Sequence, residues 1–239
     1  MPLIKTKHED IITTEQWTKL LNLAAKLDFE KTRRAPPYKL WMQATLAIDW
    51  LTGKRINEIL SLKRKHFSFE DKMIKILFFV GKKKARSSPL EQLPYQKTRT
   101  IDHQAVPYIL AYLDEYDRVN KSKEGYLFPA QTQQQYRVVH TTFLNGQGEK
   151  ETREYEYTLP GGYVYEQTAR YWLSKINKQL PENERIYFHW GRHTIGIKMA
   201  RQGRSAWQIG EVLDDTERAA TEYTKKAGGY AQEWTKETE

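Results

Sequence analysis

Apolar side chains recur at helical spacing through most of this chain. The stretch TTEQWTKLLNLAAKL has this spacing and starts with Thr13 and Thr14, either of which is a good N-cap, so a helix is expected to begin there. The run YKLWMQATLAIDWLT (38–52) is apolar on most sides and predicts a buried helix that ends at Gly53.

Further helices are predicted along the rest of the chain. A short one in KRINEILSL turns its apolar residues inward and places Arg55 and Glu58 together on another face, because the two are three positions apart. A capping box of Ser205 and Gln208 begins another helix. The predicted helical runs are 54–62, 105–119, 164–180, 193–202, 205–213 and 216–227, the last stopped by Gly228-Gly229.

Two β-hairpins interrupt this helical pattern. MIKILFFVG (73–81) reads as a strand, and KTRTIDH (97–103) as its returning partner after a long basic turn. Residues 136–158 predict a second hairpin around the turn signal Asn145-Gly146. The fold class is therefore α+β and mainly α-helical, with a small antiparallel sheet, and the absence of a linker favours one domain.

Composition narrows the class of protein. With 239 residues, 39% of them hydrophobic, the chain can bury a core, and no apolar run reaches the length that spans a bilayer. The N-terminus lacks the apolar segment of a signal peptide, and without cysteine there is no disulfide or thiol nucleophile. An intracellular protein fits these features.

Charge is distributed unevenly along the chain. The formal net charge is +9, yet residues 31–100 alone hold 17 Lys and Arg against 5 Asp and Glu. Such an excess favours a polyanionic partner such as nucleic acid, although a solvated basic face on an ordinary enzyme would look the same.

The stretch FHWGRH (188–193) allows two kinds of chemistry. His189 and His193 lie four positions apart, so on a helix they share a face and could hold zinc. A zinc hydrolase of this helical type needs a glutamate after the first histidine to activate water, and Trp190 stands there instead. His189 with Arg192 could instead bind a phosphate, and this interpretation is preferred.

Three segments that carry candidate site residues follow one another along the chain: TGKRINEILSLKRKHF (52–67), HWGRHT (189–194) and ATEYTKKA (220–227). Together they resemble the tyrosine recombinases, or phage-type integrases, which carry Thr-Gly-x-Arg-x-x-Glu early, His-x-x-Arg-His late and a nucleophilic tyrosine some thirty residues later. The resemblance implies a catalytic domain over 13–227, an N-terminal extension over 1–12 and a C-terminal tail over 228–239.

The resemblance implies a set of catalytic residues. Arg55 and Arg192 would hold the scissile phosphate of DNA, His189 would donate to the same oxygens, and Tyr223 would be the nucleophile. Permanently charged, forked guanidiniums suit the negative charge that grows on the phosphate oxygens. Glu58 and His193 would support the arginines and the imidazole without contacting the phosphate.

A lysine in a β-hairpin turn is the general acid of the family. In this chain VGKKKARSSPLEQLPYQKTRT offers several lysines, of which Lys82 follows Gly81 as that lysine often does, with Lys84 as the alternative. Lys83, Lys84, Arg86 and Lys97 are expected to contact DNA phosphates. No cofactor and no metal is expected.

The chain departs from the family pattern in three places. Where the family has Leu-Gly-His, or tryptophan for that histidine, about nine residues before the tyrosine, this chain has Asp214 or Asp215, depending on register. Asp214 is taken as a supporting residue. Gly191 replaces the usual leucine and is expected to loosen packing beneath the His-Arg pair. Few residues precede the first helix, which fits either a fragment of a longer recombinase or a minimal enzyme.

The function implied is site-specific recombination or integration of double-stranded DNA through a 3′-phosphotyrosine intermediate. Strand exchange implies a dimer or tetramer on DNA. The resemblance also implies a location in the cytoplasm of a prokaryotic cell, associated with the nucleoid and without membrane attachment. A virus or a mobile element would be a fitting source of the gene. Two alternatives stay open. One is a catalytically impaired DNA-binding regulator or architectural protein on the same fold, and the other is relaxation of supercoils in the manner of type IB topoisomerases.

Overall fold

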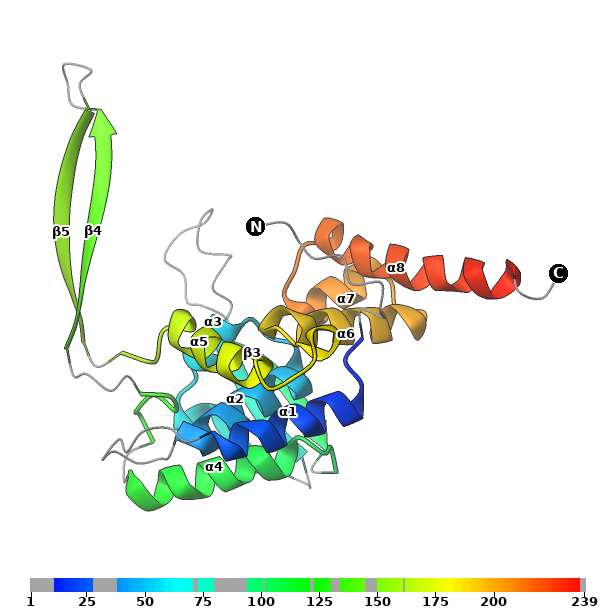
Figure 1. The fold of residues 1–239 in the computed structure, drawn as a ribbon, viewed down its shortest axis with the longest axis horizontal. Helices are drawn as coiled ribbons and strands as arrows, with labels where there is room; N and C mark the ends of the chain where they lie inside the picture. Colours follow the sequence, from blue (N-terminus) through cyan, green and yellow to red (C-terminus); the bar gives the residue numbers. More distant parts are fainter. Residues whose placement is uncertain are drawn as a thin grey trace.

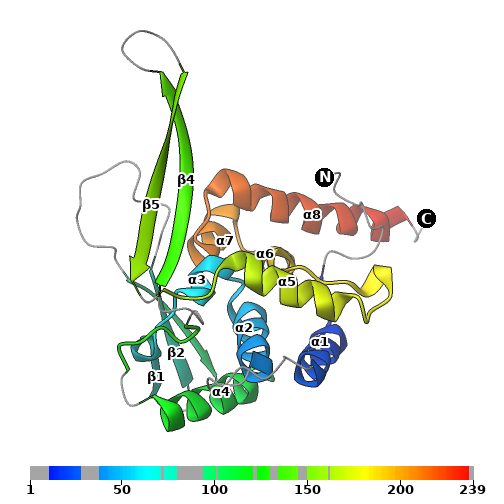
Figure 2. The ribbon, with the colours of Figure 1, turned by 60° about the vertical axis from the view of Figure 1, so that its left-hand side comes forward.

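The chain folds into a helical body with a small sheet on one side (Figure 2) and a long two-stranded ribbon that extends away from it (Figure 1). The computed structural model describes residues 11–27, 38–70, 73–79, 94–100, 102–120, 123–129, 134–144, 150–160 and 162–236. The α-helices are α1 (Thr14–Lys26), α2 (Tyr38–Thr52), α3 (Ile56–Leu60), α4 (Val106–Val119), α5 (Glu166–Asn177), α6 (Phe188–Arg201), α7 (Ala206–Leu213) and α8 (Glu217–Lys236). Short 3₁₀ turns are η1 (Arg64–His66) and η3 (Glu182–Glu184).

Helix α2 is the centre of the main core. It packs against α1, α4 and α6, as expected for a helix that is apolar on most sides (Figure 2). Trp17 of α1 stacks on Trp50 of α2, with ring centroids 5.7 Å apart. The buried hydroxyl of Thr52 donates to the carbonyl oxygen of Ile48, so this polar side chain is satisfied within its own helix.

The sheet has one strand more than the sequence pattern indicated. Strands β1 (Phe67–Glu70), β2 (Met73–Phe79) and β3 (Pro94–Thr100) are antiparallel and lie in that order. The expected pair is confirmed by the register of Met73 with Thr100. Strand β1 was missed, since its four residues are too short to show an alternating pattern.

The second hairpin is confirmed and forms the projecting ribbon. Strands β4 (Gln134–Leu144) and β5 (Lys150–Pro160) pair antiparallel along their full length. The ribbon extends away from the helical body between α4 and α5 in the chain order (Figures 1 and 2).

The C-terminal helices form a smaller core of their own. Ile197, Ile209, Leu213, Ala220 and Tyr223 are buried together where α6, α7 and α8 meet. The Ser205–Gln208 capping box at the start of α7 is confirmed. The predicted stop at Gly228-Gly229 is wrong, because α8 continues to Lys236. Two glycines cost a helix only about 1 kcal/mol each, and the helix-compatible residues that follow them let it continue.

Helix α6 also begins earlier than predicted. It starts at Phe188 and not at His193, so the whole FHWGRH stretch is helical. Within the ranges described above, every helix is too short or too polar to cross a bilayer.

Candidate active site

Arg55 is fixed at the start of α3 by Glu58. Its backbone N–H donates to Glu58 Oε2 and its Nη1 donates to Glu58 Oε1, both at 3.0 Å. The turn before it depends on Gly53, which has a left-handed φ of +59°, a backbone conformation that favours glycine. The contact predicted between Arg55 and Glu58 is therefore present.

Arg192 lies on α6 and is buried, with 1% of its surface exposed. Its Nη1 donates to the carbonyl oxygen of Gly53 at 3.3 Å, and this bond ties α6 to the turn that precedes Arg55. A guanidinium so deeply buried needs an anionic partner, since an unpaired buried charge is strongly destabilising.

That partner is Asp215, which also meets Arg55. Its Oδ2 accepts from Arg192 Nη2 at 2.8 Å, and its Oδ1 accepts from Arg55 Nη2 at 3.1 Å. The two arginines, called the arginine pair from here on, therefore converge on one carboxylate. The residues that the sequence predicted to act together do lie together.

Asp214 and Asp215 form the turn between α7 and α8. Asp214 is the C-cap of α7 and has φ +55°, and its carbonyl oxygen accepts from Arg55 Nη2 at 3.1 Å. Its carboxylate lies 3.8 Å from Arg55 Nη1 and does not reach Arg192 in any hydrogen bond of the described residues. Asp214 thus adopts the left-handed conformation that glycine favours, and Asp215 is the residue that follows it.

Tyr223 lies on α8 with its side chain directed at α6. Only 4% of it is exposed, its ring lies against Gly196, and its ring centroid is 5.5 Å from that of His193. Burial raises the pKa of the phenol, and the positive charge of Arg192 opposes this rise. The predicted nucleophile is therefore close to the arginine pair and protonated at neutral pH.

His189 and His193 meet edge to face, with centroids 4.5 Å apart, so that His193 stands between His189 and Tyr223. Burial lowers the pKa of His189, and the charge of Arg192 lowers it further. A neutral imidazole at pH 7 is expected, which can still donate one N–H to an anion.

The arginine pair and His189 line one cavity of about 320 Å³. Lys54, which the sequence interpretation overlooked, lines it as well. That lysine is only 2% exposed, and its Nζ lies 5.7 Å from the centroid of the Phe78 ring. Burial lowers its pKa, while Glu58 and Asp214 partly offset that effect.

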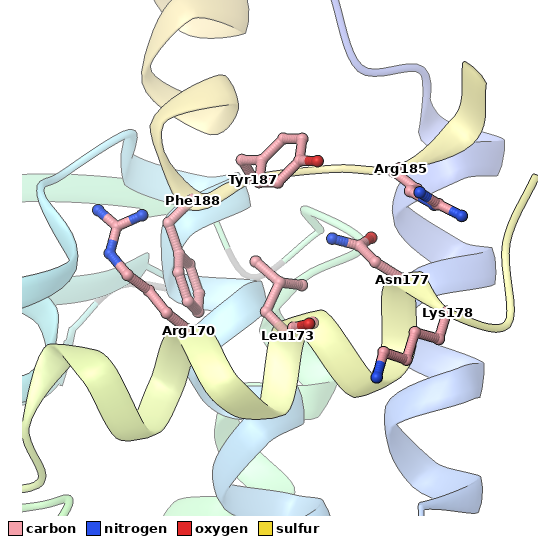
Figure 3. Close-up of a pocket in the computed structure, with 8 residues that line it drawn as sticks. Arg170, Leu173, Asn177, Lys178, Arg185, Tyr187 and Phe188 are labelled. Atoms are coloured by element: carbon pink, nitrogen blue, oxygen red, sulfur yellow. The ribbon is translucent and has the colours of Figure 1, made fainter. Parts of the chain in front are cut away.

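A second cavity, of about 440 Å³, continues from the first and shares Arg170 and Phe188 with it. It lies between α5 and the segment that leads into α6, with Arg170 at one end and Arg185 and Lys178 at the other (Figure 3). Arg170 is held by Glu166, but among the described residues no acidic side chain lines this cavity. Two adjoining cavities, in each of which basic side chains outnumber acidic ones, therefore meet at Arg170 and Phe188.

The expected loosening at Gly191 is wrong. A Cβ built there would meet the Asp49 carboxylate at 2.5 Å, so the side chain of Asp49 fills the space that the leucine of the family would occupy. Asp49 is 1% exposed, and within the described part of the chain neither of its carboxylate oxygens has a hydrogen-bond partner. Burial raises its pKa well above the usual range, against the opposing charge of Arg192.

Most of the predicted DNA-binding residues lie outside the described part of the chain. These are Lys83, Lys84 and Arg86, and Lys82, the predicted general acid, lies outside it as well. Lys97 belongs to β3 and its backbone pairs with Ile76, while its side chain is not described. Within the described residues, no three His, Cys, Asp or Glu side chains are grouped as metal ligands would be.

The geometry of the arginine pair agrees with the comparison of the whole sequence with protein families. A model of the phage integrase family matches residues 10–227. The chain belongs to the phage integrase family. No curated protein is similar enough in sequence to be counted as a relative of this integrase-family chain.

Solved structures place the integrase-family chain on the same fold. The XerH site-specific recombinase bound to palindromic difH substrate, a post-cleavage complex, aligns with a TM-score of 0.60 at 16% identity, over 94% of this chain and 52% of the recombinase chain. The XerA recombinase aligns with a TM-score of 0.52 at 14% identity, over 90% of this chain and 59% of its own. This chain thus spans between half and three fifths of the length of these structures, and the likeness at this identity concerns the fold.

Proposed function

We propose that this chain is the catalytic part of a site-specific DNA recombinase or integrase that acts through a 3′-phosphotyrosine at Tyr223. The observation that carries the proposal is the convergence of Arg55 and Arg192 on one anion, beside a buried tyrosine. Two guanidiniums held in this way suit a phosphodiester whose non-bridging oxygens gain charge during displacement.

The proposed reaction is an exchange of phosphodiester bonds. Tyr223 loses its proton to solvent and its oxygen attacks the phosphorus, forming a phosphotyrosine bond as the bond to the 5′ oxygen breaks. The leaving oxygen takes a proton from a hairpin lysine, Lys82 or Lys84. A 5′ hydroxyl from a partner strand then returns its proton to this lysine and attacks the phosphotyrosine, and Tyr223 leaves and takes up a proton from solvent. Because bond energy is conserved, the scheme needs neither ATP nor a metal.

The two adjoining cavities support a path for the DNA backbone. With the scissile phosphate at the arginine pair, the neighbouring phosphates would lie near Arg170, Arg185 and Lys178. Tyr187 is exposed and lines the second cavity, where its ring could stack on a base of the DNA beside these charges. Strand exchange would bring two or four protomers together on paired sites in the nucleoid.

A second candidate, a DNA-binding regulator that lacks catalysis, is favoured by one specific observation. Asp215 carries a negative charge where the family has histidine or tryptophan, directly between the two arginines. If this carboxylate never leaves, the protein would bind DNA without cleaving it.

A nicked suicide substrate separates the two candidates. Release of the short 5′ fragment next to the nick prevents religation, so a cleaving enzyme accumulates as a covalent protein–DNA adduct that survives denaturation. We expect such an adduct from the unmodified protein and none from Tyr223→Phe.

Tyr112→Phe is the matched control for this experiment. Tyr112 is equally buried but lies in the main core, where its hydroxyl donates to the carbonyl of Leu127, and its variant should still form the adduct. DNA binding with no adduct from any of the three proteins would favour the regulator. An adduct that persists in Tyr223→Phe would place the nucleophile elsewhere.

A further inference from the structure

The Asp215 carboxylate binds the arginine pair through equivalent atoms. Each guanidinium uses Nη2 for this contact, at 3.1 Å from Arg55 and 2.8 Å from Arg192. The Nη1 atoms are engaged elsewhere, by Glu58 for Arg55 and by the Gly53 carbonyl for Arg192. The two Nη2 groups are therefore held toward one point by bonds that do not involve Asp215.

A carboxylate resembles a phosphodiester in the feature that guanidiniums recognise. Each presents two oxygens that share a negative charge, and arginine forks bind both. The carboxylate and a phosphate cannot share the same donors, because two anions at hydrogen-bonding distance of one another repel strongly in a partly buried site.

Asp215 is also placed where it can move. It lies in the turn between α7 and α8, is partly exposed, and follows Asp214, whose left-handed φ of +55° is unusual for a residue with a side chain. Its backbone N–H is held by one bond to the carbonyl of Gly210 at 2.9 Å. Rotation of the Asp215 side chain would free the Nη2 N–H that each arginine now donates to it, while Glu58, the Gly53 carbonyl and the Asp214 carbonyl stay in contact with the arginines.

We propose that Asp215 is an internal competitor for the phosphate: its carboxylate and a DNA phosphodiester bind the arginine pair in turn, so that DNA must displace Asp215 before cleavage. The proposal rests on the proposed function in taking a phosphodiester as the ligand of the pair. It makes Asp215 a residue that sets the affinity of the site for phosphate, since a competitor that holds the site nine-tenths of the time weakens binding about ten-fold.

Inorganic phosphate is the simplest probe, because its binding requires no cleavage. Phosphate-dependent thermal unfolding of the full chain reports affinity for the folded protein. Asp215→Asn keeps the shape of the side chain and removes its charge, and is expected to bind phosphate about ten-fold or more tightly than the unmodified protein. Asp215→Ser provides a second, shorter side chain with the same expectation.

Two control proteins show whether any gain arises at this site. Asp117 accepts hydrogen bonds from both Nε and Nη2 of Arg64, which does not belong to the arginine pair. Asp117→Asn therefore removes the same charge as Asp215→Asn and leaves the arginine pair untouched. It should bind phosphate as the unmodified protein does. Adding Arg55→Gln to Asp215→Asn should abolish the gain.

Equal phosphate affinity in the unmodified protein and both Asp215 variants would overturn the proposal, as would weaker binding in the variants, which would mean that Asp215 only supports the arginines. The suicide-substrate experiment and the phosphate-binding experiment are independent of each other. Tighter phosphate binding by the Asp215 variants without a covalent adduct would contradict the cleavage function alone. An adduct without tighter phosphate binding would contradict only the role of Asp215 as a competitor.

Discussion

The ring of Tyr223 lies against Gly196 so closely that a Cβ on this glycine would come within 2.7 Å of the ring's Cγ. Gly196 is one helical turn after Arg192 on α6, so both residues share a face. The missing side chain at Gly196 therefore allows the ring of Tyr223 to approach the helix that carries Arg192.

Gly196→Ala is expected to displace Tyr223 and to impair cleavage. The added methyl group should lower the free energy of unfolding by about 1–3 kcal/mol, as overpacking does, and lower adduct formation from nicked DNA by about ten-fold or more, while DNA binding persists. Urea unfolding and adduct yield measure the two effects.

The same helix pair supplies a control in Gly228→Ala. A Cβ there would meet nothing within 4 Å, so this variant should gain up to about 1 kcal/mol from helix propensity and keep its adduct yield. If both alanine variants cleaved equally well, the contact between Tyr223 and Gly196 would have no catalytic importance.

Lys54→Met should stabilise the protein and weaken its hold on phosphate. Lys54 is buried and its pKa is lowered chiefly by burial, so the charged form is costly in the folded state. Methionine has a similar length without charge, and we expect about 1 kcal/mol of added stability at pH 7. The same change removes a cation from the cavity of the arginine pair, so affinity for inorganic phosphate should fall.

The pH dependence of this effect has a definite sign. The pKa of Lys54 is lower in the folded protein than in the unfolded chain, so the unfolded chain binds more protons between the two values. The cost of burying the charged lysine therefore shrinks as pH rises through the folded pKa toward 10.5. The stability difference between Lys54→Met and the unmodified protein should therefore narrow between pH 7 and 10. A constant difference would contradict the assigned burial cost.

His66 should make the protein sensitive to mild acid. It is 7% exposed, its Nδ1 accepts a hydrogen bond from the backbone of Lys63 at 3.1 Å, and burial lowers its pKa to about 4, with Lys65 and Lys63 contributing. The unfolded chain binds this proton near pH 6.5, so stability is lost as pH falls from 6.5 to 4, by at most about 3 kcal/mol.

His66→Asn keeps an acceptor near Nδ1 and cannot titrate in this range. Urea unfolding at pH values between 4 and 7 should show a shallower loss of stability in this variant than in the unmodified protein. Parallel curves for the two proteins would mean that His66 is not held neutral in the folded state.

Short motifs that resemble those of the tyrosine recombinases were enough to predict much of the site. The spacing of Arg55 and Glu58 on one helix and the order of Arg192 and Tyr223 along the chain required no knowledge of packing, and the structure brings these residues together. The same local reasoning failed at Gly228-Gly229, where a modest cost in helix propensity does not end a helix.

Contacts with a distant partner were not found from the sequence. Asp214 or Asp215 was singled out as a departure from the family pattern, but not the contact of Asp215 with Arg55, which is 160 positions earlier. Asp49 matters because α2 and α6 pack together. A pattern along one segment shows which side faces inward, but it does not say which segment lies opposite.

Asp49 and Gly191 should be coupled strongly enough to measure. The Asp49 carboxylate fills the volume above Gly191, and its raised pKa favours the neutral acid in the folded state. Because the folded pKa lies above the unfolded value of 3.8, stability is lost as pH rises from that value through the folded pKa. Asp49→Asn should remove this dependence and exceed the unmodified protein in stability at pH 7.

A double-mutant cycle tests the shared volume directly. Gly191→Leu alone places a side chain on the Asp49 carboxylate and should cost about 2–3 kcal/mol or more, whereas Asp49→Ala alone leaves a small gap. In the double variant the leucine occupies that gap, so its stability should exceed the sum of the single effects by about 2 kcal/mol, measured by urea unfolding. Additive effects would show that the two positions do not compete for one space.

Because Arg192 follows Gly191 directly, recovery of adduct formation in the double variant would further show that this packing sets the position of the arginine pair.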